Sequence, residues 1–152
     1  MRRLVQGSTG QALAEFALVV PIFLLLLFGI IDLGRLVYTA NALSNGAREA
    51  ARAGSVGTRP PECNGLSREV CIQRVAASHA WGLPGTSVTT DVDCERWAAG
   101  APSPTSIAVG QCRTDDLLAV RSSTVFSLLT PIIGQFIGEF DLTGDSKVTV
   151  HQ

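Results

Sequence analysis

The chain has 152 residues and a mass of 16.0 kDa, which fits one domain and nearly excludes two of full size. Twelve basic side chains against thirteen acidic ones give a net charge of −1, which argues against a general nucleic-acid-binding protein. Charged residues make up 16% of the chain, whereas roughly 25% is usual for a soluble domain. This deficit comes from one stretch of the sequence.

The apolar residues concentrate in a charge-free run from Phe16 to Ile31, which predicts a transmembrane helix. About 20 residues are needed to cross a hydrocarbon core of roughly 30 Å. Ala12–Ala14 extend the apolar character of the run, and it is long enough if Leu33 and its neighbours join it. The residues assigned to the membrane anchor are Phe16, Pro21, Leu24, Leu25, Leu26, Leu27 and Ile31.

Two other kinds of segment carry a similar apolar run. A buried helix of a soluble protein needs protein on every side, and too little chain remains to supply it. A cleaved signal peptide would join Arg2 and Arg3 to a shorter apolar region with a small-x-small cleavage site, whereas Asp32, Gly34 and Arg35 follow this run. We therefore expect the segment to be retained, and Arg2 and Arg3 favour a cytoplasmic N-terminus.

The anchor is expected to continue into a projecting helix. From Gln11 to Ala53 this helix would be roughly 65 Å long at about 1.5 Å per residue, and Gly54 would end it as a C-cap. Pro21 either kinks the helix or is harmless near its first turn. Spacings of three and four residues predict a packing face for the chain's own C-terminal domain, for neighbouring subunits, or for both. It consists of Leu33, Leu36, Ala40, Leu43, Ala47, Ala50 and Gly54.

The residues before the run carry a resemblance to a known family. Glu15 is a lone carboxylate at the membrane edge, where an acidic residue marks a partner or a recognition role unless it snorkels to the headgroups. The motifs that carry the resemblance are Gly10 with Gln11-Ala12-Leu13-Ala14-Glu15-Phe16, the run through Pro21, Gly29–Arg35, Asn41 and Ala47–Arg52. With these motifs the chain resembles the TadE-like proteins, which are pseudopilins or minor pilins of the tight-adherence (Flp, type IVc) pilus system. The resemblance covers the first third densely and Leu117–Val150 only in outline.

The resemblance implies that a prepilin peptidase cuts between Gly10 and Gln11, so that Glu15 becomes the fifth residue of the mature chain. Glycine permits an extended backbone to enter a narrow protease cleft. The resemblance also implies that Glu15, which is followed by Phe16, pairs with the N-terminal amine of a neighbouring subunit. Gln11 departs from the phenylalanine of the major type IVa pilins, which puts N-methylation in doubt.

Residues 54–152 are expected to form a small exported α+β domain, pilin-like with a small antiparallel sheet, after a leader at 1–10 and a helix at 11–53. Residues 55–65 read as a loop, and Ser67 caps a helix to about Ala80. Alternation predicts a strand over 88–95, with further strands at 117–126 and 147–151. Residues 98–110 read as a loop, and 131–140 as a short helix that begins with Pro131.

Four cysteines lie on the exported side, where an even number favours disulfides. Three pairings are possible. We prefer Cys63 with Cys71 and Cys94 with Cys112, because this pairing closes short loops. A zinc site of four thiolates is the alternative, although no C-x-x-C pair is present.

The sequence offers no convergent catalytic group. His79 and His151 are the only histidines, and no G-x-S-x-G, H-E-x-x-H or P-loop motif occurs. The carboxylates of Asp91, Asp93 and Glu95 would share one strand face. Such a face could bind Ca²⁺, but a solvated polar face is the preferred interpretation. No cofactor or metal is expected.

The function predicted from these features is non-catalytic pilus assembly. The chain would cross the bacterial inner membrane once, with its N-terminus in the cytoplasm and its C-terminal domain exported, and would act from the membrane or within a pilus. Its partners would be the lipid bilayer, a prepilin peptidase, other pilins or pseudopilins and pilus assembly components, and no nucleic acid. The alternative is a membrane-tethered exported binding or envelope protein outside any pilus, and an enzyme comes third.

Overall fold

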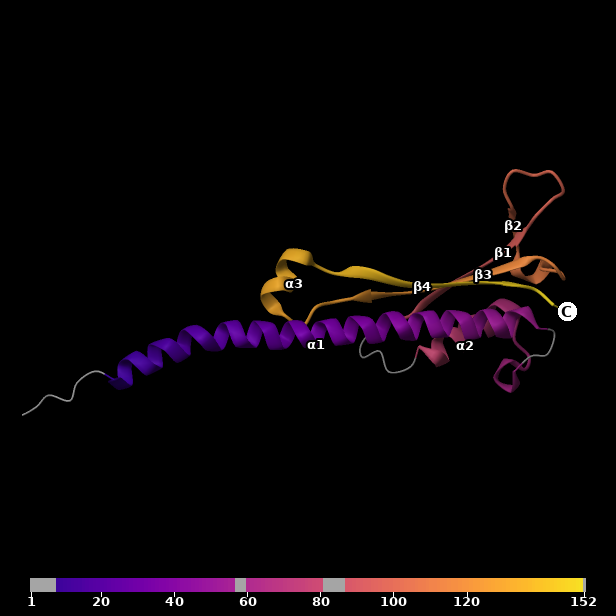
Figure 1. Ribbon diagram of the computed structural model, residues 1–152. Coiled ribbons are helices and arrows are strands. Elements are labelled where there is room, and N and C mark those ends of the chain that lie inside the picture. Colours follow the sequence, from indigo (N-terminus) through magenta and orange to yellow (C-terminus); the bar gives the residue numbers. More distant parts are fainter. Residues whose placement is uncertain (1–7, 57–59, 81–86, 152) are drawn as a thin grey trace, which may run out of the picture.

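The computed structural model describes residues 8–56, 60–80 and 87–151, so Arg2, Arg3 and most of the expected leader lie outside the described residues. A long helix carries an α+β domain along its second half (Figure 1), which confirms the expected fold class. The elements in chain order are α1 (Ser8–Ser55), η1 (Pro61–Cys63), α2 (Arg68–His79), β1 (Thr89–Arg96), β2 (Thr105–Ile107), η2 (Val109–Gln111), β3 (Leu117–Phe126), α3 (Pro131–Ile137) and β4 (Phe140–Thr149).

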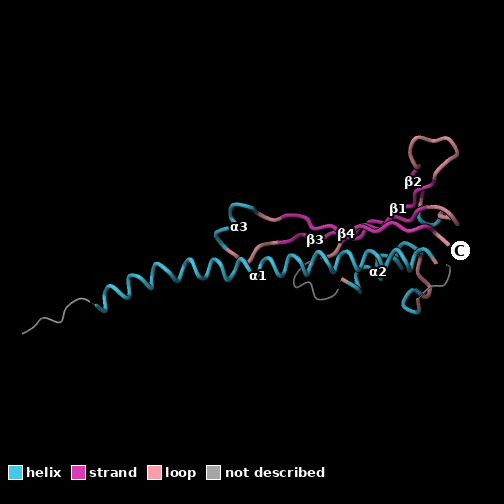
Figure 2. Tube along the Cα trace, viewed as in Figure 1, coloured by secondary structure: helices cyan, strands magenta, loops and turns pink. Residues whose placement is uncertain are grey.

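Helix α1 is a single element of 48 residues that passes through Pro21 without interruption. At about 1.5 Å per residue it is roughly 70 Å long, so only part of it can lie within a bilayer. The first half projects away from all other described elements, and the second half runs beside the sheet (Figure 2).

The end of α1 differs from the prediction. Gly54 does not cap the helix, which continues to Ser55. A Cβ atom on Gly54 would lie 2.6 Å from both Ile72 Cδ1 and Leu118 Cδ2. Glycine therefore fits closely against these two side chains, which a larger residue would have to displace. The guanidinium of Arg68 donates hydrogen bonds to the Gly54 carbonyl.

The domain is built on a four-stranded antiparallel sheet in the order β2-β1-β3-β4. Strands β3 and β4 pair over their whole length, from Leu117 opposite Thr149 to Phe126 opposite Phe140. The predicted strands at 88–95 and 117–126 match β1 and β3 closely, because both alternate buried and exposed side chains.

Two segments were predicted incorrectly. The expected loop at 98–110 contains the short strand β2 and the turn η2. The last strand was expected only at 147–151, but β4 runs from Phe140 to Thr149 through Gly144. Gly144 lies in β4 because the strand there passes directly over the backbone of α1.

The core lies between the sheet and the two helices α1 and α2. Helix α1 packs on β3 and β4, and α2 packs on α1 and β1. Ser67 caps α2 as predicted, since its side chain accepts a hydrogen bond from the Val70 amide at 3.3 Å. The buried apolar residues at the centre are Leu43, Ala47, Ala50, Ala51, Ile72, Val75, Ala76, Leu118, Val120 and Val150.

Covalent and ionic links close the far end of the domain. Cys63 is bonded to Cys71 and Cys94 to Cys112, which is the pairing preferred on the sequence. Beside the second disulfide, Arg96 forms an ion pair with Asp116 at 2.6 Å. Hydrogen bonds from Arg96 and from the Arg113 amide lower the pKa of Asp116 to about 2, so this carboxylate is ionised at neutral pH.

The close contact between β4 and α1 predicts that Gly144→Ala destabilises the domain. A Cβ atom at this position would lie 2.5 Å from the carbonyl carbon of Leu43 and 2.6 Å from the amide nitrogen of Ser44. Neither backbone atom can turn aside, so we expect a loss of about 1–3 kcal/mol in the free energy of unfolding. Denaturant unfolding of the full chain in detergent, followed by circular dichroism, measures it.

Gly110→Ala is the matched control, because a Cβ atom there meets no atom within 4 Å. Its unfolding free energy should stay within about 0.5 kcal/mol of the wild type. Equal stability of the two variants would contradict the packing of β4 on α1.

Candidate functional site

The candidate processing site lies in the first turns of α1. Gly10 and Gln11 are helical and exposed, and the Gln11 side-chain amide donates a hydrogen bond to Glu15 Oε1 at 3.2 Å. A Cβ atom on Gly10 would meet nothing within 4 Å, and Phe16 is 67% exposed. Because residues 8–10 are helical, binding in an extended form requires this first turn to unwind.

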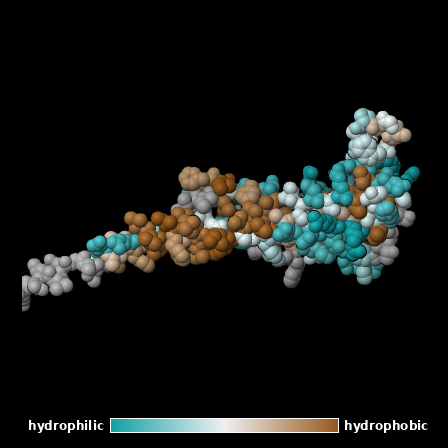
Figure 3. Space-filling model, in the orientation of Figure 1, coloured by the Kyte–Doolittle hydropathy of each residue, from teal (hydrophilic) through white to brown (hydrophobic). Residues whose placement is uncertain are grey.

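The apolar run is exposed on all sides of α1, and its exposed side chains are called the anchor surface below. Figure 3 shows hydrophobic atoms along this half of the helix, in contrast to the hydrophilic surface of the domain. Of the residues assigned to the anchor, Leu25 is half-buried and the others are exposed. The anchor surface consists of Leu13, Phe16, Leu18, Val19, Ile22, Phe23, Leu24, Leu26, Leu27, Phe28, Ile30 and Ile31.

Among the described residues, α1 is the one helix long and apolar enough to cross a membrane. Almost none of its most apolar 18-residue window is buried within the protein, so the run is not the core helix of a soluble domain. Apolar surface on all sides of a helix is stable in lipid and costly in water. The helix therefore suggests a single-pass membrane anchor.

The face of α1 that packs on the chain's own domain begins after Leu33. Leu33 was expected on a packing face for this domain or for neighbouring subunits, and it is 62% exposed. Leu36 and Ala40 are half-buried, and Leu43, Ala47 and Ala50 are fully buried against the chain's own domain. The small side chains of Ala47 and Ala50 leave room for other elements to pack closely on α1, which contacts α2 and β4.

Asp32 marks the junction between the exposed and the packed halves of α1, a role that its sequence context did not predict. Its side chain is only 5% exposed. The carboxylate accepts hydrogen bonds from the Leu129 amide at 2.9 Å, the Thr130 amide at 3.0 Å and the Thr130 hydroxyl at 2.6 Å. Arg35 Nη1 lies 3.5 Å from the same carboxylate.

This junction holds the end of the β3–β4 hairpin against α1. Thr130 directly precedes α3 and is buried, so its amide would otherwise lack a partner away from water. Arg35 adds a contact, since its guanidinium lies 5.3 Å from the centre of the Phe126 ring. The signal in the sequence was a single acid directly after a charge-free run, although its partners 97 and 98 residues away could not be read from it.

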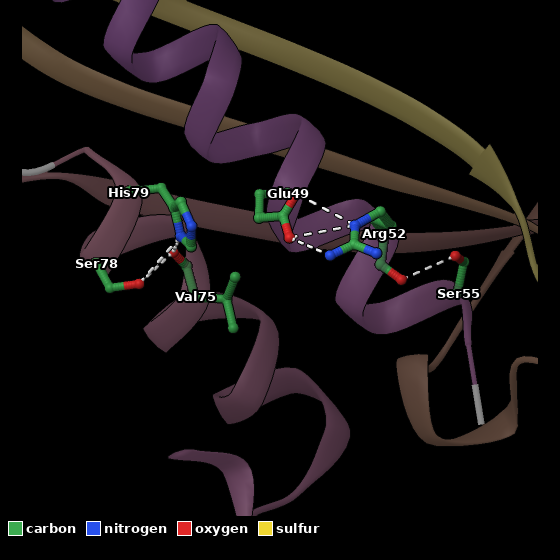
Figure 4. Close-up of polar contacts among 6 residues, drawn as sticks. All are labelled: Glu49, Arg52, Ser55, Val75, Ser78 and His79. Atoms are coloured by element: carbon green, nitrogen blue, oxygen red, sulfur yellow. Dashed lines mark hydrogen bonds and ion pairs between the residues drawn. The ribbon is translucent and has the colours of Figure 1, made fainter. Parts of the chain in front are cut away.

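The described histidines have local structural contacts. His79 Nδ1 lies 3.0 Å from the Val75 carbonyl and 3.2 Å from Ser78 Oγ, all within the last turn of α2 (Figure 4). The nearby Glu49 carboxylate is bonded to Arg52 at 2.6 Å. The backbone amide of His151 donates to the Ser55 carbonyl at 2.8 Å, which ties the last residues to the end of α1.

The candidate metal ligands have other partners. The sulfurs of Cys94 and Cys112 lie near Asp116, but both sulfurs belong to a disulfide and Asp116 is bound by Arg96. On β1, Asp91 and Asp93 are exposed, and Lys147 lies 2.8 Å from Glu95. These carboxylates form a solvated charged face together with Arg121 and Asp145, which are paired at 2.7 Å.

Comparison with known families gives a match to the N-terminal helix. The family model described as TadE-like protein matches residues 10–52. No curated protein and no solved structure gives a match. The match coincides with α1 up to its last turn and stops before the domain, so the resemblance to TadE-like proteins is confirmed over that helix.

The Asp32 junction predicts that Asp32→Ala releases the hairpin end from α1. Two backbone amides and one hydroxyl would lose their acceptor. A hydrogen bond to a charged group contributes about 1.5–3 kcal/mol to stability. We expect a loss of about 2–4 kcal/mol in unfolding free energy and faster hydrogen exchange at Leu129 and Thr130. Unchanged exchange at both amides would contradict this role. Asp141→Ala, an exposed carboxylate of β4, is the control that should leave them protected.

Proposed function

We propose that this chain, whose residues 10–52 match the TadE-like family, is a minor pilin or pseudopilin of a tight-adherence (Flp) pilus. The observation that carries the proposal is the coincidence of that match with α1, a helix whose first half is exposed and apolar and whose second half forms the core of a domain. Such a helix can hold the domain at a membrane and pack with similar helices.

The orientation follows from the chemistry of the two ends. The N-terminus lies in the cytoplasm of a bacterial cell, α1 crosses the inner membrane, and residues 54–152 are exported. Both disulfides lie in that exported part, where an oxidising compartment keeps them intact. Arg2 and Arg3 on the cytoplasmic side agree with this direction of insertion.

Processing by a prepilin peptidase is the first step of the proposed mechanism. The enzyme cuts the peptide bond between Gly10 and Gln11 after the first turn of α1 unwinds. Gly10 favours this step because it is exposed, has no packed neighbour and destabilises a helix by about 1 kcal/mol relative to alanine. Gln11 then carries the new N-terminal amine, one helical turn from Glu15.

Assembly is the second step. The exposed Glu15 carboxylate pairs with the N-terminal amine of a neighbouring subunit, and a charge pair at the edge of a low-dielectric region is strong. The anchor surface packs against the apolar helices of other pilins. The domain itself has a structural role without catalysis, which agrees with the local contacts of His79 and with the ion pair between Glu95 on β1 and Lys147.

The alternative function is a membrane-tethered exported domain that binds an envelope component outside any pilus. It shares the anchor and the domain with a minor pilin. It does not require Glu15, because a tether needs no charge pair with a neighbouring subunit.

Glu15→Ala therefore separates the two functions. In cells that contain the pilus system, we expect this variant to lose crosslinking to pilin components, since the neighbouring amine has no counter-charge. Crosslinking of membrane-embedded protein, followed by co-purification and mass spectrometry, measures it. Glu62→Ala removes an exposed carboxylate from η1, far from the membrane, and should crosslink like the wild type. If Glu15→Ala crosslinks as well as the wild type, assembly through this residue is refuted.

A further inference from the structure

The end of the β3–β4 hairpin carries an exposed apolar patch. Outside α1, the large hydrophobic side chains exposed among the described residues number seven, and four of them lie between residues 125 and 137. Phe136 is 87% exposed, which is the largest value of all. The other three are Val125, Leu129 and Ile137, and they form with Phe136 what is called the hairpin patch below. A patch of this kind in one place indicates a binding surface.

The hairpin patch lies beside the end of the charge-free run of α1. The Asp32 carboxylate binds the Leu129 and Thr130 amides, so α3 begins beside the residue that directly follows the charge-free run. Figure 1 shows α3 lying over α1 at the end of the sheet nearest the anchor. Hydrophobic atoms at this level are continuous with those of the anchor surface (Figure 3).

The length of the run sets the depth of α3. From residue 12 to residue 31, α1 rises about 30 Å at 1.5 Å per residue, which equals the thickness of the hydrocarbon core. Asp32 then lies at the exported boundary of that core, and α3 lies at the same height. Leu33 and Val37 are 62% and 50% exposed, so apolar surface on α1 continues past this boundary. A shallower position of α1 in the bilayer would expose still more of this apolar surface to water.

The charges around the patch fit a lipid interface. No charged residue occurs between Arg121 and Glu139, so the whole hairpin end is uncharged. Arg35 lies beside it, with its guanidinium near Asp32 and the Phe126 ring and its side chain 30% exposed, at the height of the lipid phosphates. Glu139 and Asp141 are exposed where β4 leaves the patch toward the domain.

We propose that α3 is a second membrane contact, whose Phe136 and Ile137 enter the outer leaflet of the bilayer that α1 crosses. The proposal rests on the membrane anchor in the proposed function. Lipid is the occupant because the patch stands at the height where the anchor leaves the hydrocarbon core and adjoins the anchor surface. Interfacial segments of this kind bury their apolar side chains about 5–10 Å deep at the boundary between headgroups and acyl chains. The two contacts fix the rotation of the domain about α1 at the membrane.

Tryptophan fluorescence in vesicles tests this contact. The full chain, with Trp81→Phe and Trp97→Phe as background, is reconstituted into vesicles of phosphatidylethanolamine and phosphatidylglycerol that carry bromine on the acyl chains. The Phe136→Trp variant is expected to emit at short wavelength and to lose fluorescence to the bromines. The loss should approach that of Phe23→Trp, a position within the anchor surface.

Val70→Trp on α2 is the matched control, since Val70 is 44% exposed and distant from the anchor, and it should stay unquenched. Three results would overturn the proposal while leaving the anchor intact. The first is an unquenched Phe136→Trp beside a quenched Phe23→Trp, and the second is equal quenching of Val70→Trp. The third is a short-wavelength emission of Phe136→Trp without quenching, which indicates contact with a second copy or another protein. An unquenched Phe23→Trp would instead refute the membrane anchor and the proposed function together.

Discussion

The Asp32 carboxylate accepts three hydrogen bonds at the point where α1 changes its surroundings. Before this residue the charge-free run of α1 is exposed and apolar on every side. After it one face of the helix packs on the domain, while Leu33 and Val37 remain exposed on another. A buried carboxylate is costly unless its oxygens are bonded, and here the amides of Leu129 and Thr130 bond them. The position of the hairpin end, the height of α3 and the start of the packed half of α1 all depend on this contact.

The packed half of α1 shows how a narrow helix can support a domain. Ala47 and Ala50 are fully buried, and Gly54 lies where Ile72 and Leu118 leave no room for a side chain. Small residues bring α2 and β4 close to the helix backbone, so a modest number of apolar residues fills the core. The remaining face of α1 is free to meet other proteins. A helix of this kind therefore serves as both an anchor and a scaffold.

Much of the fold could be predicted from the sequence because the relevant signals are local. Each signal depends only on neighbours in the chain. The charge-free run predicted α1, the capping serine predicted the start of α2, and the alternation of apolar and polar residues predicted β1. The short loops between cysteines likewise favoured the pairing of Cys63 with Cys71 and of Cys94 with Cys112.

The incorrect predictions concern contacts between distant segments. Gly54 resembled a helix cap because glycine is common there, yet it lies within α1, close to the side chains of Ile72 and Leu118. Leu33 kept the helical spacing of the packing face, but the chain's own domain leaves it exposed, so its contact with a neighbouring subunit stays a prediction. Asp32 was visible as an isolated acid, whereas its partners in the hairpin end are 97 and 98 residues away. The candidate processing site rests on sequence pattern, to which the fold adds the exposure of Gly10 and the hydrogen bond between Gln11 and Glu15.

Intact-mass spectrometry of the chain extracted from membranes that contain an active prepilin peptidase tests most directly whether this is a processed pilin. The expected mass is that of a chain that begins at Gln11, and the same chain beside an inactive peptidase should keep its full mass. A mass that still includes Met1–Gly10 beside a peptidase that processes its own pilin would contradict that identity.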